Sequence, residues 1–150
     1  MNEETDSPRI RQTESGYKYE VSVLRSVCDE AMISVGKSQN IDQFNIAINY
    51  LISSIDTLEA KLCPYHDREY LKERDKFNKI EIMTKDEFIK SRKKQSDYNP
   101  NKVDMEYDNY RLNVLMQKCK KKYEALMRLQ DRKNLLLEEE TEDYVGGKPG

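Results

Sequence analysis

The stretch LEAKLCPYHDREYLKER, residues 58–74, holds the residues of this chain whose types and spacing could do chemistry. Cys63 and the chain's single histidine, His66, lie three positions apart, and a thiolate and an imidazole at such a spacing can share a zinc ion. The same two side chains could also act as a nucleophile and its general base. Either use needs further partners, which the rest of the sequence would have to supply.

Those partners are missing from the sequence. A structural zinc site needs four ligands, whereas Cys28 and Cys119 are single residues inside helical patterns and no second histidine exists. A catalytic cysteine and histidine normally come from separate elements that converge. The glycine-rich GGKPG lies at residues 146–150, without a strand before it or a helix after it, so it does not resemble a phosphate loop. We therefore expect no catalytic residue, no metal and no cofactor, and a protein that is not an enzyme.

A structural role explains the same stretch. Pro64 disfavours a helical conformation for Cys63 and lacks a backbone donor, so one helix should end near Leu62. Asp67 is well placed to cap a following helix. The sequence thus predicts a junction between two helices at residues 63–67.

The composition bounds the size of the core. Apolar residues make up 37% of the chain and charged residues 36%, against about 45–50% and about 25% in average globular proteins. A thin core of this kind is typical of long helices that each bury a single stripe of apolar residues. The three cysteines do not form a disulfide framework, so we expect them to be reduced and buried. No secretory signal and no membrane-spanning apolar run is evident, which predicts a cytoplasmic protein.

Apolar residues recur in the alternating four-and-three spacing of a heptad seam. Two seams flank the polar connector GKSQN and predict an antiparallel helical hairpin over residues 17–63. A third seam lies in a long helix from Val103 to about Glu139. The first seam is Tyr17, Val21, Leu24, Cys28, Ala31 and Val35; the second is Phe44, Ile48, Leu51, Ile55, Leu58 and Leu62; the third is Leu112, Met116, Cys119, Tyr123 and Leu126.

Between the hairpin and the long helix, the pattern predicts a kinked helix over residues 67–94, with a break or kink near Met83 and then a short helix to about Lys94. Thr84 and Glu87 have the spacing of a capping box, which places the break near Met83. The following segment, QSDYNPNKVD, contains Pro100 and is turn-rich, so we expect a connector, with a binding loop at Asp97–Pro100 as the alternative.

The expected fold is therefore all-α, a three- to four-helix bundle with an N-terminal antiparallel helical hairpin and a long C-terminal helix. We divide the chain into a disordered acidic N-terminal tail at residues 1–15, a helical bundle domain at 16–139 and a disordered acidic, glycine-rich tail at 140–150. Residues 1–15 carry a net charge of −2 and residues 138–150 a net charge of −4, which leaves +4 for residues 16–137.

The leading functional hypothesis is a non-enzymatic interaction or assembly protein that binds a protein partner or a second copy of itself, because three seams accompany too little apolar mass for a self-contained globule. The bias toward Lys, Asn, Ile, Tyr and Asp would suit an accessory protein of phage or archaeal origin. The predicted coiled-coil interface consists of Leu112, Met116, Tyr123, Leu126, Leu135 and Leu137.

The alternative is a small helical regulator that binds nucleic acid through a basic stripe. Residues 111–133 carry a net charge of +6, and such a density of cations can bind phosphates. A third hypothesis, a metal-dependent enzyme at Cys63–Asp67, is the least supported. The cations of the stripe that we expect to contact nucleic acid are Lys118, Lys120, Lys121, Lys122, Arg128 and Arg132.

Overall fold

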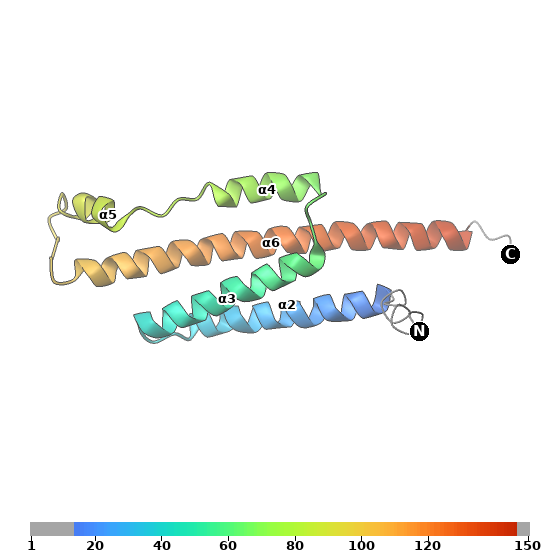
Figure 1. Ribbon diagram of the computed structural model, residues 1–150, viewed down its shortest axis with the longest axis horizontal. Helices are drawn as coiled ribbons and strands as arrows, with labels where there is room; N and C mark the ends of the chain where they lie inside the picture. The colour runs from blue at the N-terminus through green and yellow to red at the C-terminus, as the bar shows by residue number, and fades with distance from the viewer. Residues whose placement is uncertain (1–13, 147–150) are drawn as a thin grey trace, which may run out of the picture.

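The computed structural model describes residues 14–146, with side chains for residues 16–134. Within these ranges the chain is helical and has no strand, so the predicted all-α class is confirmed. Figure 1 shows α6 flanked by α4 and α5 on one side and by α3 and α2 on the other. The helices are α2 (Glu14–Gly36), α3 (Ile41–Leu62), α4 (Arg68–Asn78), α5 (Lys85–Arg92) and α6 (Val103–Gly146).

The three predicted seams lie in one shared core, as in a helical bundle. Tyr17, Leu24, Phe44, Met116 and Tyr123 are partly buried and pack against its fully buried members. Tyr70 and Phe77 add α4 to the core, and their rings meet edge to face at 6.3 Å. The buried members of the seams are Val21, Cys28, Ala31 and Val35 on α2, Ile48, Leu51, Ile55, Leu58 and Leu62 on α3, and Leu112, Cys119 and Leu126 on α6.

The start of α3 is fixed by reciprocal capping. The side chain of Asn40 accepts a hydrogen bond from the Gln43 N–H at 2.8 Å. Gln43 in turn accepts one from the Gln39 N–H at 2.9 Å. The Gln43 N–H, a donor that the helix leaves unpaired at its N-terminus, is thus satisfied, and the Gln43 side chain also fixes the residue before the cap. The connector from α2 needs only residues 37–40.

The predicted break near Met83 and the short helix after it are confirmed, since an irregular stretch at residues 79–84 separates α4 from α5. The segment at 67–94 is therefore two separate helices and not one kinked helix. The periodic burial stops at Phe77, and α4 ends at Asn78 rather than near Met83. Two tyrosines of α6 bind the backbone beyond it: Tyr107 donates to the Met83 carbonyl at 2.8 Å, and the Met83 N–H donates to the Tyr110 hydroxyl at 3.0 Å. These contacts replace the hydrogen bonds that a continuing helix would have made.

The predicted capping box is confirmed, since Thr84 and Glu87 bond to each other's backbone at the start of α5.

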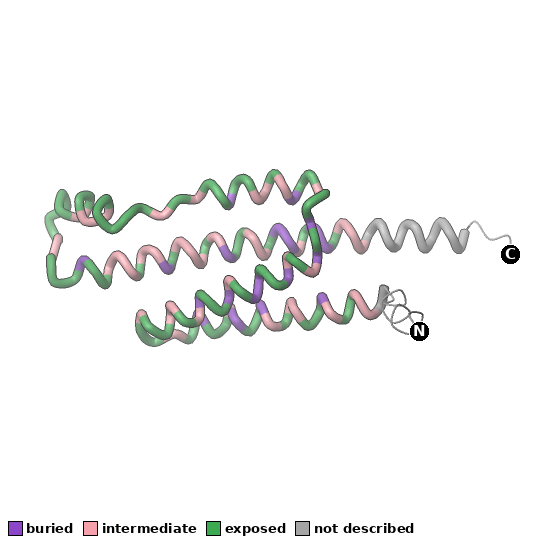
Figure 2. Tube along the Cα trace, viewed as in Figure 1, coloured by how far each residue is buried: buried purple, intermediate pink, exposed green. Residues whose placement is uncertain are grey.

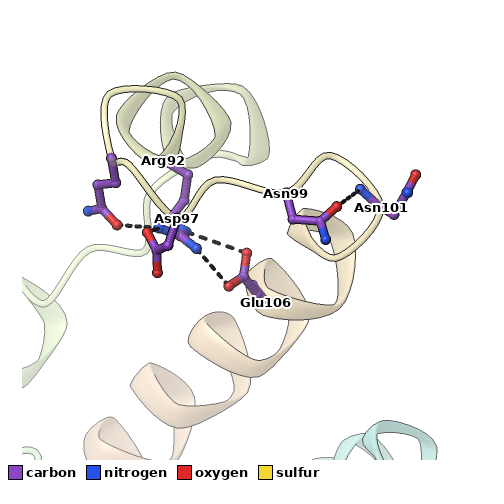
Figure 3. Close-up of polar contacts among 6 residues, drawn as sticks. Arg92, Asp97, Asn99, Asn101 and Glu106 are labelled. Carbon is purple, nitrogen blue, oxygen red and sulfur yellow. Dashed lines mark hydrogen bonds and ion pairs between the residues drawn. The ribbon is translucent and has the colours of Figure 1, made fainter.

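The connector between α5 and α6, residues 93–102, is fixed by hydrogen bonds from Arg92. Its guanidinium donates to Asp97 at 2.8 Å within the connector and to Glu106 on α6 at 2.9 Å (Figure 3). Arg92 thus joins the connector both to itself and to the start of α6.

The long helix α6 continues to Gly146, beyond the predicted end near Glu139. No glycine or proline interrupts the sequence between Val103 and Gly146, so nothing in the backbone stops the helix earlier. Residues 140–146, predicted as tail, are therefore helical. Residues 14 and 15, also predicted as tail, are the first residues of α2. The rest of the predicted tails, residues 1–13 and 147–150, lies outside the described residues.

Candidate functional site

The junction between α3 and α4 begins with an unusual backbone conformation at Cys63. This residue has φ 49° and ψ 61°, in the left-handed region, and among the described residues other than glycine it alone has a positive φ. Its N–H donates to the Glu59 carbonyl at 2.8 Å, which closes the last turn of α3. The predicted helix end near Leu62 is confirmed, but the predicted burial of Cys63 is wrong, because this cap turns its side chain into solvent.

Two cations of α6 bind the junction. The ammonium of Lys133 donates to the Leu62 carbonyl at 2.5 Å, one of the groups that the end of α3 leaves unpaired. The guanidinium of Arg132 donates to the Asp67 carboxylate at 2.7 Å, and that carboxylate also accepts from the Tyr70 N–H at 2.8 Å as the N-cap of α4. Consecutive residues of α6 therefore fix both the end of α3 and the start of α4.

The electrostatics of Asp67 reflect these contacts. Burial by itself would raise the pKa of its carboxyl group, but the hydrogen bonds from Arg132 and from the Tyr70 backbone outweigh burial and hold the pKa below its usual value. The ionised carboxylate is thus part of the folded structure.

The other candidate groups of the junction lie on its surface. His66 and Tyr65 are exposed, like Cys63. Among the described residues, no three histidine, cysteine or acidic side chains lie close enough to hold a metal ion. Burial raises the pKa of both Cys28 and Cys119 to about 11, so these thiols stay protonated at neutral pH and are poor nucleophiles.

A second polar site, which the sequence analysis missed, joins three helices at Glu59. The Tyr70 hydroxyl of α4 donates to one carboxylate oxygen at 2.5 Å, and Lys122 of α6 lies 3.1 Å from the other. Burial, and then the hydrogen bond to Glu59, raises the pKa of Tyr70. Within residues 16–134 no buried side-chain nitrogen or oxygen lacks a hydrogen bond. The polar groups of the interior thus stabilise the fold, and a heptad count that considers only apolar residues cannot find them.

A small cavity lies beside this polar site, between α3, α4 and α6. Its volume is about 190 Å³, and its walls include Ile52, Phe77, Leu115 and Cys119. Ligand pockets usually enclose about 300–1,000 Å³, and the neighbouring Lys122 is already paired with Asp56 and Glu59. We therefore assign no ligand to this cavity.

The predicted interface residues of α6 lie mainly in the chain's own core. Leu112 and Leu126 are 0% exposed, and Met116 and Tyr123 pack against the same core. Tyr123 also donates a hydrogen bond to Asp29 of α2 at 2.8 Å. The side chains of Leu135 and Leu137 lie outside the described residues.

The predicted basic stripe is divided by ion pairs within the chain. Lys122 pairs with Asp56 at 2.7 Å, Arg128 donates to Glu73 at 2.7 Å, and Arg132 binds Asp67. Lys120 and Lys121 are exposed, and Lys118 is half-buried beside the small cavity. The cations that the sequence places in one run are therefore used largely to join α6 to α3 and α4.

The outward faces of α2 and α3 carry a feature that the sequence analysis overlooked. Each helix has a second stripe in four-and-three spacing, opposite its buried seam, and every member of both stripes is exposed. Figure 2 shows exposed and buried segments alternating along both helices. The α2 stripe is Tyr19, Val23, Ser26, Glu30 and Ile33, and the α3 stripe is Ile46, Tyr50, Ser53, Thr57 and Ala60.

Comparison of the chain with protein-family models, curated proteins and solved structures found no match. Within residues 14–146, no helix is both long and apolar enough to cross a membrane.

The left-handed backbone of Cys63 predicts how substitutions at this position change the stability of the protein against urea. Cys63→Gly should unfold at a higher denaturant concentration than the wild type, because glycine adopts this conformation without the cost of about 1 kcal/mol that a side chain brings. Cys63→Val should unfold at a lower concentration, because a β-branched residue is the least tolerant of it. Urea unfolding followed by circular dichroism measures the order, and a valine variant as stable as the glycine variant would contradict the conformation described for Cys63.

The lowered pKa of Asp67 predicts a pH-dependent contribution to stability. The carboxylate should stabilise the fold fully above about pH 4, its usual unfolded pKa, and lose this effect as the pH falls through its lower folded value. Asp67→Asn keeps a capping side chain but loses the ion pair. It should cost about 1–2 kcal/mol at pH 7 and progressively less below pH 4.

Arg132→Gln supplies the matched control, measured by urea unfolding from pH 7 to pH 3. In that background Asp67→Asn should cost less than in the wild type, because the partner of the carboxylate is already gone. Unfolding free energies of Asp67→Asn and wild type that differ by a constant amount at every pH would refute the role given to this ion pair.

Proposed function

We propose that this chain is a non-enzymatic interaction protein that self-associates through the outward faces of α2 and α3. In this proposal the two helices act as an antiparallel hairpin, which the short connector at residues 37–40 permits. Their inner faces build the core, and their outer faces are left for a second protein surface.

The observation that carries the proposal is the exposure of large apolar side chains on these outer faces. Tyr19 is 71% exposed, Ile46 69%, Ile33 56% and Tyr50 53%. Single exposed apolar residues are common on protein surfaces. Here, however, they recur with heptad spacing in a chain of which 36% is charged, and helices with such a second stripe commonly pack against a further helix.

The proposal moves the predicted interface from α6 to α2 and α3. Leu112 and Leu126 could reach a partner only if the bundle opened, because both are fully buried. Exposing them would forfeit the burial of two leucines, each worth about 1.5–3 kcal/mol. The outer faces of α2 and α3 are available without that cost.

Nucleic-acid binding by the basic stripe receives less support. Lys122, Arg128 and Arg132 would have to exchange internal carboxylate partners for phosphates, so much of the expected electrostatic gain would be offset. Of the predicted set, Lys118, Lys120 and Lys121 form no ion pair with a carboxylate of the described residues.

Light scattering after size exclusion, over a dilution series, tests the proposal. The wild type should exceed its monomer mass of 17.8 kDa at high concentration and approach it on dilution. The triple variant Ile33→Lys, Ile46→Lys and Tyr50→Lys should remain monomeric with unchanged helix content, because it alters exposed positions only.

Leu126→Lys is the matched control, since it should unfold the protein rather than dissociate it. A wild-type mass of 17.8 kDa at every concentration would contradict the proposal. A heavy peak with excess absorbance at 260 nm would contradict it in favour of nucleic-acid binding.

A further inference from the structure

The outer stripe of α3 differs from that of α2 in charge. Ile46, Tyr50, Ser53, Thr57 and Ala60 are all uncharged and all exposed. The α3 stripe thus carries no charge, in a chain with 36% charged residues. Two copies of this stripe can therefore meet without bringing like charges of the stripe together.

The α2 stripe lacks this property. Glu30 lies within it, between Ser26 and Ile33. If two copies of α2 met around a two-fold axis, their Glu30 carboxylates would be brought toward each other and desolvated, which is unfavourable. Self-association through identical surfaces is thus better served by α3.

The α3 stripe is also complementary in size to itself when reversed. Its first half carries the large residues Ile46 and Tyr50, and its second half carries the small residues Ser53, Thr57 and Ala60. Two antiparallel copies with their axis between residues 50 and 53 place Tyr50 beside the partner's Ser53. The same register places Ile46 beside the partner's Thr57. Large residues then meet small ones at these four positions, whereas a parallel pair would set large against large.

The Thr57 side chain of the stripe tolerates the loss of water. The Thr57 hydroxyl donates to the Ser53 carbonyl at 2.9 Å within α3, so its proton is already bonded when solvent is excluded. Antiparallel helices also oppose their dipoles, which is the favourable arrangement. Neither the Thr57 hydroxyl nor the helix dipoles therefore oppose the contact.

We propose that two copies of this chain pair through the outer stripe of α3, antiparallel and around a two-fold axis between Tyr50 and Ser53. This pairing rests on the proposed self-association and names its surface. A helix of 22 residues is about 33 Å long and exposes a stripe about 10 Å wide, or roughly 330 Å² per copy. This is well below the area of about 800 Å² per partner in stable complexes, so the pairing is weak and reversible.

Disulfide trapping captures a weak pair and reports its orientation. Single cysteines replace Ile46, Tyr50, Ser53, Thr57 or Ala60 in the Cys63→Gly background, where the remaining cysteines, Cys28 and Cys119, are buried. Around the proposed axis, equivalent residues at 50 or at 53 are offset by about 4.5 Å along the helix, and those at 46 or 57 by about 16 Å. A disulfide requires Cα atoms within about 7 Å.

The expected result is a cross-linked dimer for Tyr50→Cys and Ser53→Cys, at least tenfold more than for Ile46→Cys, Thr57→Cys and Ala60→Cys. Val23→Cys and Ser26→Cys, on the α2 stripe, are the matched controls and should cross-link no more than these three. Equal yields at all five α3 positions would mean a parallel pair and would overturn the inference.

The outcomes separate this inference from the proposed function. Cross-linking on α2 but not on α3, with a concentration-dependent mass, would overturn the α3 pairing and leave self-association standing. No cross-link at any position, with a mass of 17.8 kDa throughout, would overturn both.

Discussion

The clamp of Arg132 and Lys133 on the α3–α4 junction is the constraint on which the arrangement of the helices depends. The chain must end α3 and start α4 within residues 63–67, and the ends of both helices leave backbone groups unpaired. Lys133 binds a carbonyl at the end of α3, and Arg132 binds the residue that caps α4. Since both cations belong to α6, the geometry of this turn depends on the packing of α3 and α4 against that helix.

The same strategy recurs along α6. Lys122 reaches Asp56 and Glu59 of α3, Arg128 reaches Glu73 of α4, and Glu106 receives Arg92 from α5. A chain with little apolar mass thus uses paired charges to orient helices around a narrow core. Exposed pairs are worth little each, so the buried seams provide most of the stability, and the pairs at the helix ends and around Glu59 decide which helix lies against which.

Much of this fold follows from local sequence signals. Heptad spacing places Leu51, Leu58 and Leu126 in the core, and the capping chemistry of Asp67 and Thr84 marks where α4 and α5 begin. These signals are local because each depends on residues within one or two turns of the chain.

Contacts between residues distant in sequence could not be found in this way. Tyr107 and Tyr110 hold the backbone at Met83 across more than twenty positions, which is why the single kinked helix was wrong. The run of cations in α6 looked like one basic surface because the carboxylates that pair with it lie on other helices. The outer stripe of α3 is visible in the sequence as Ile46, Tyr50, Ser53, Thr57 and Ala60, but only the structure shows that no helix of the described chain covers it.

The central claim is that this protein meets its own copy through α3 rather than through α6. Hydrogen–deuterium exchange of the wild type, measured at concentrations that light scattering identifies as associated and as dissociated, tests it most directly. The account predicts that association slows exchange more in residues 42–60 than in residues 111–129. Equal slowing in both segments, or greater slowing in residues 111–129, would contradict it.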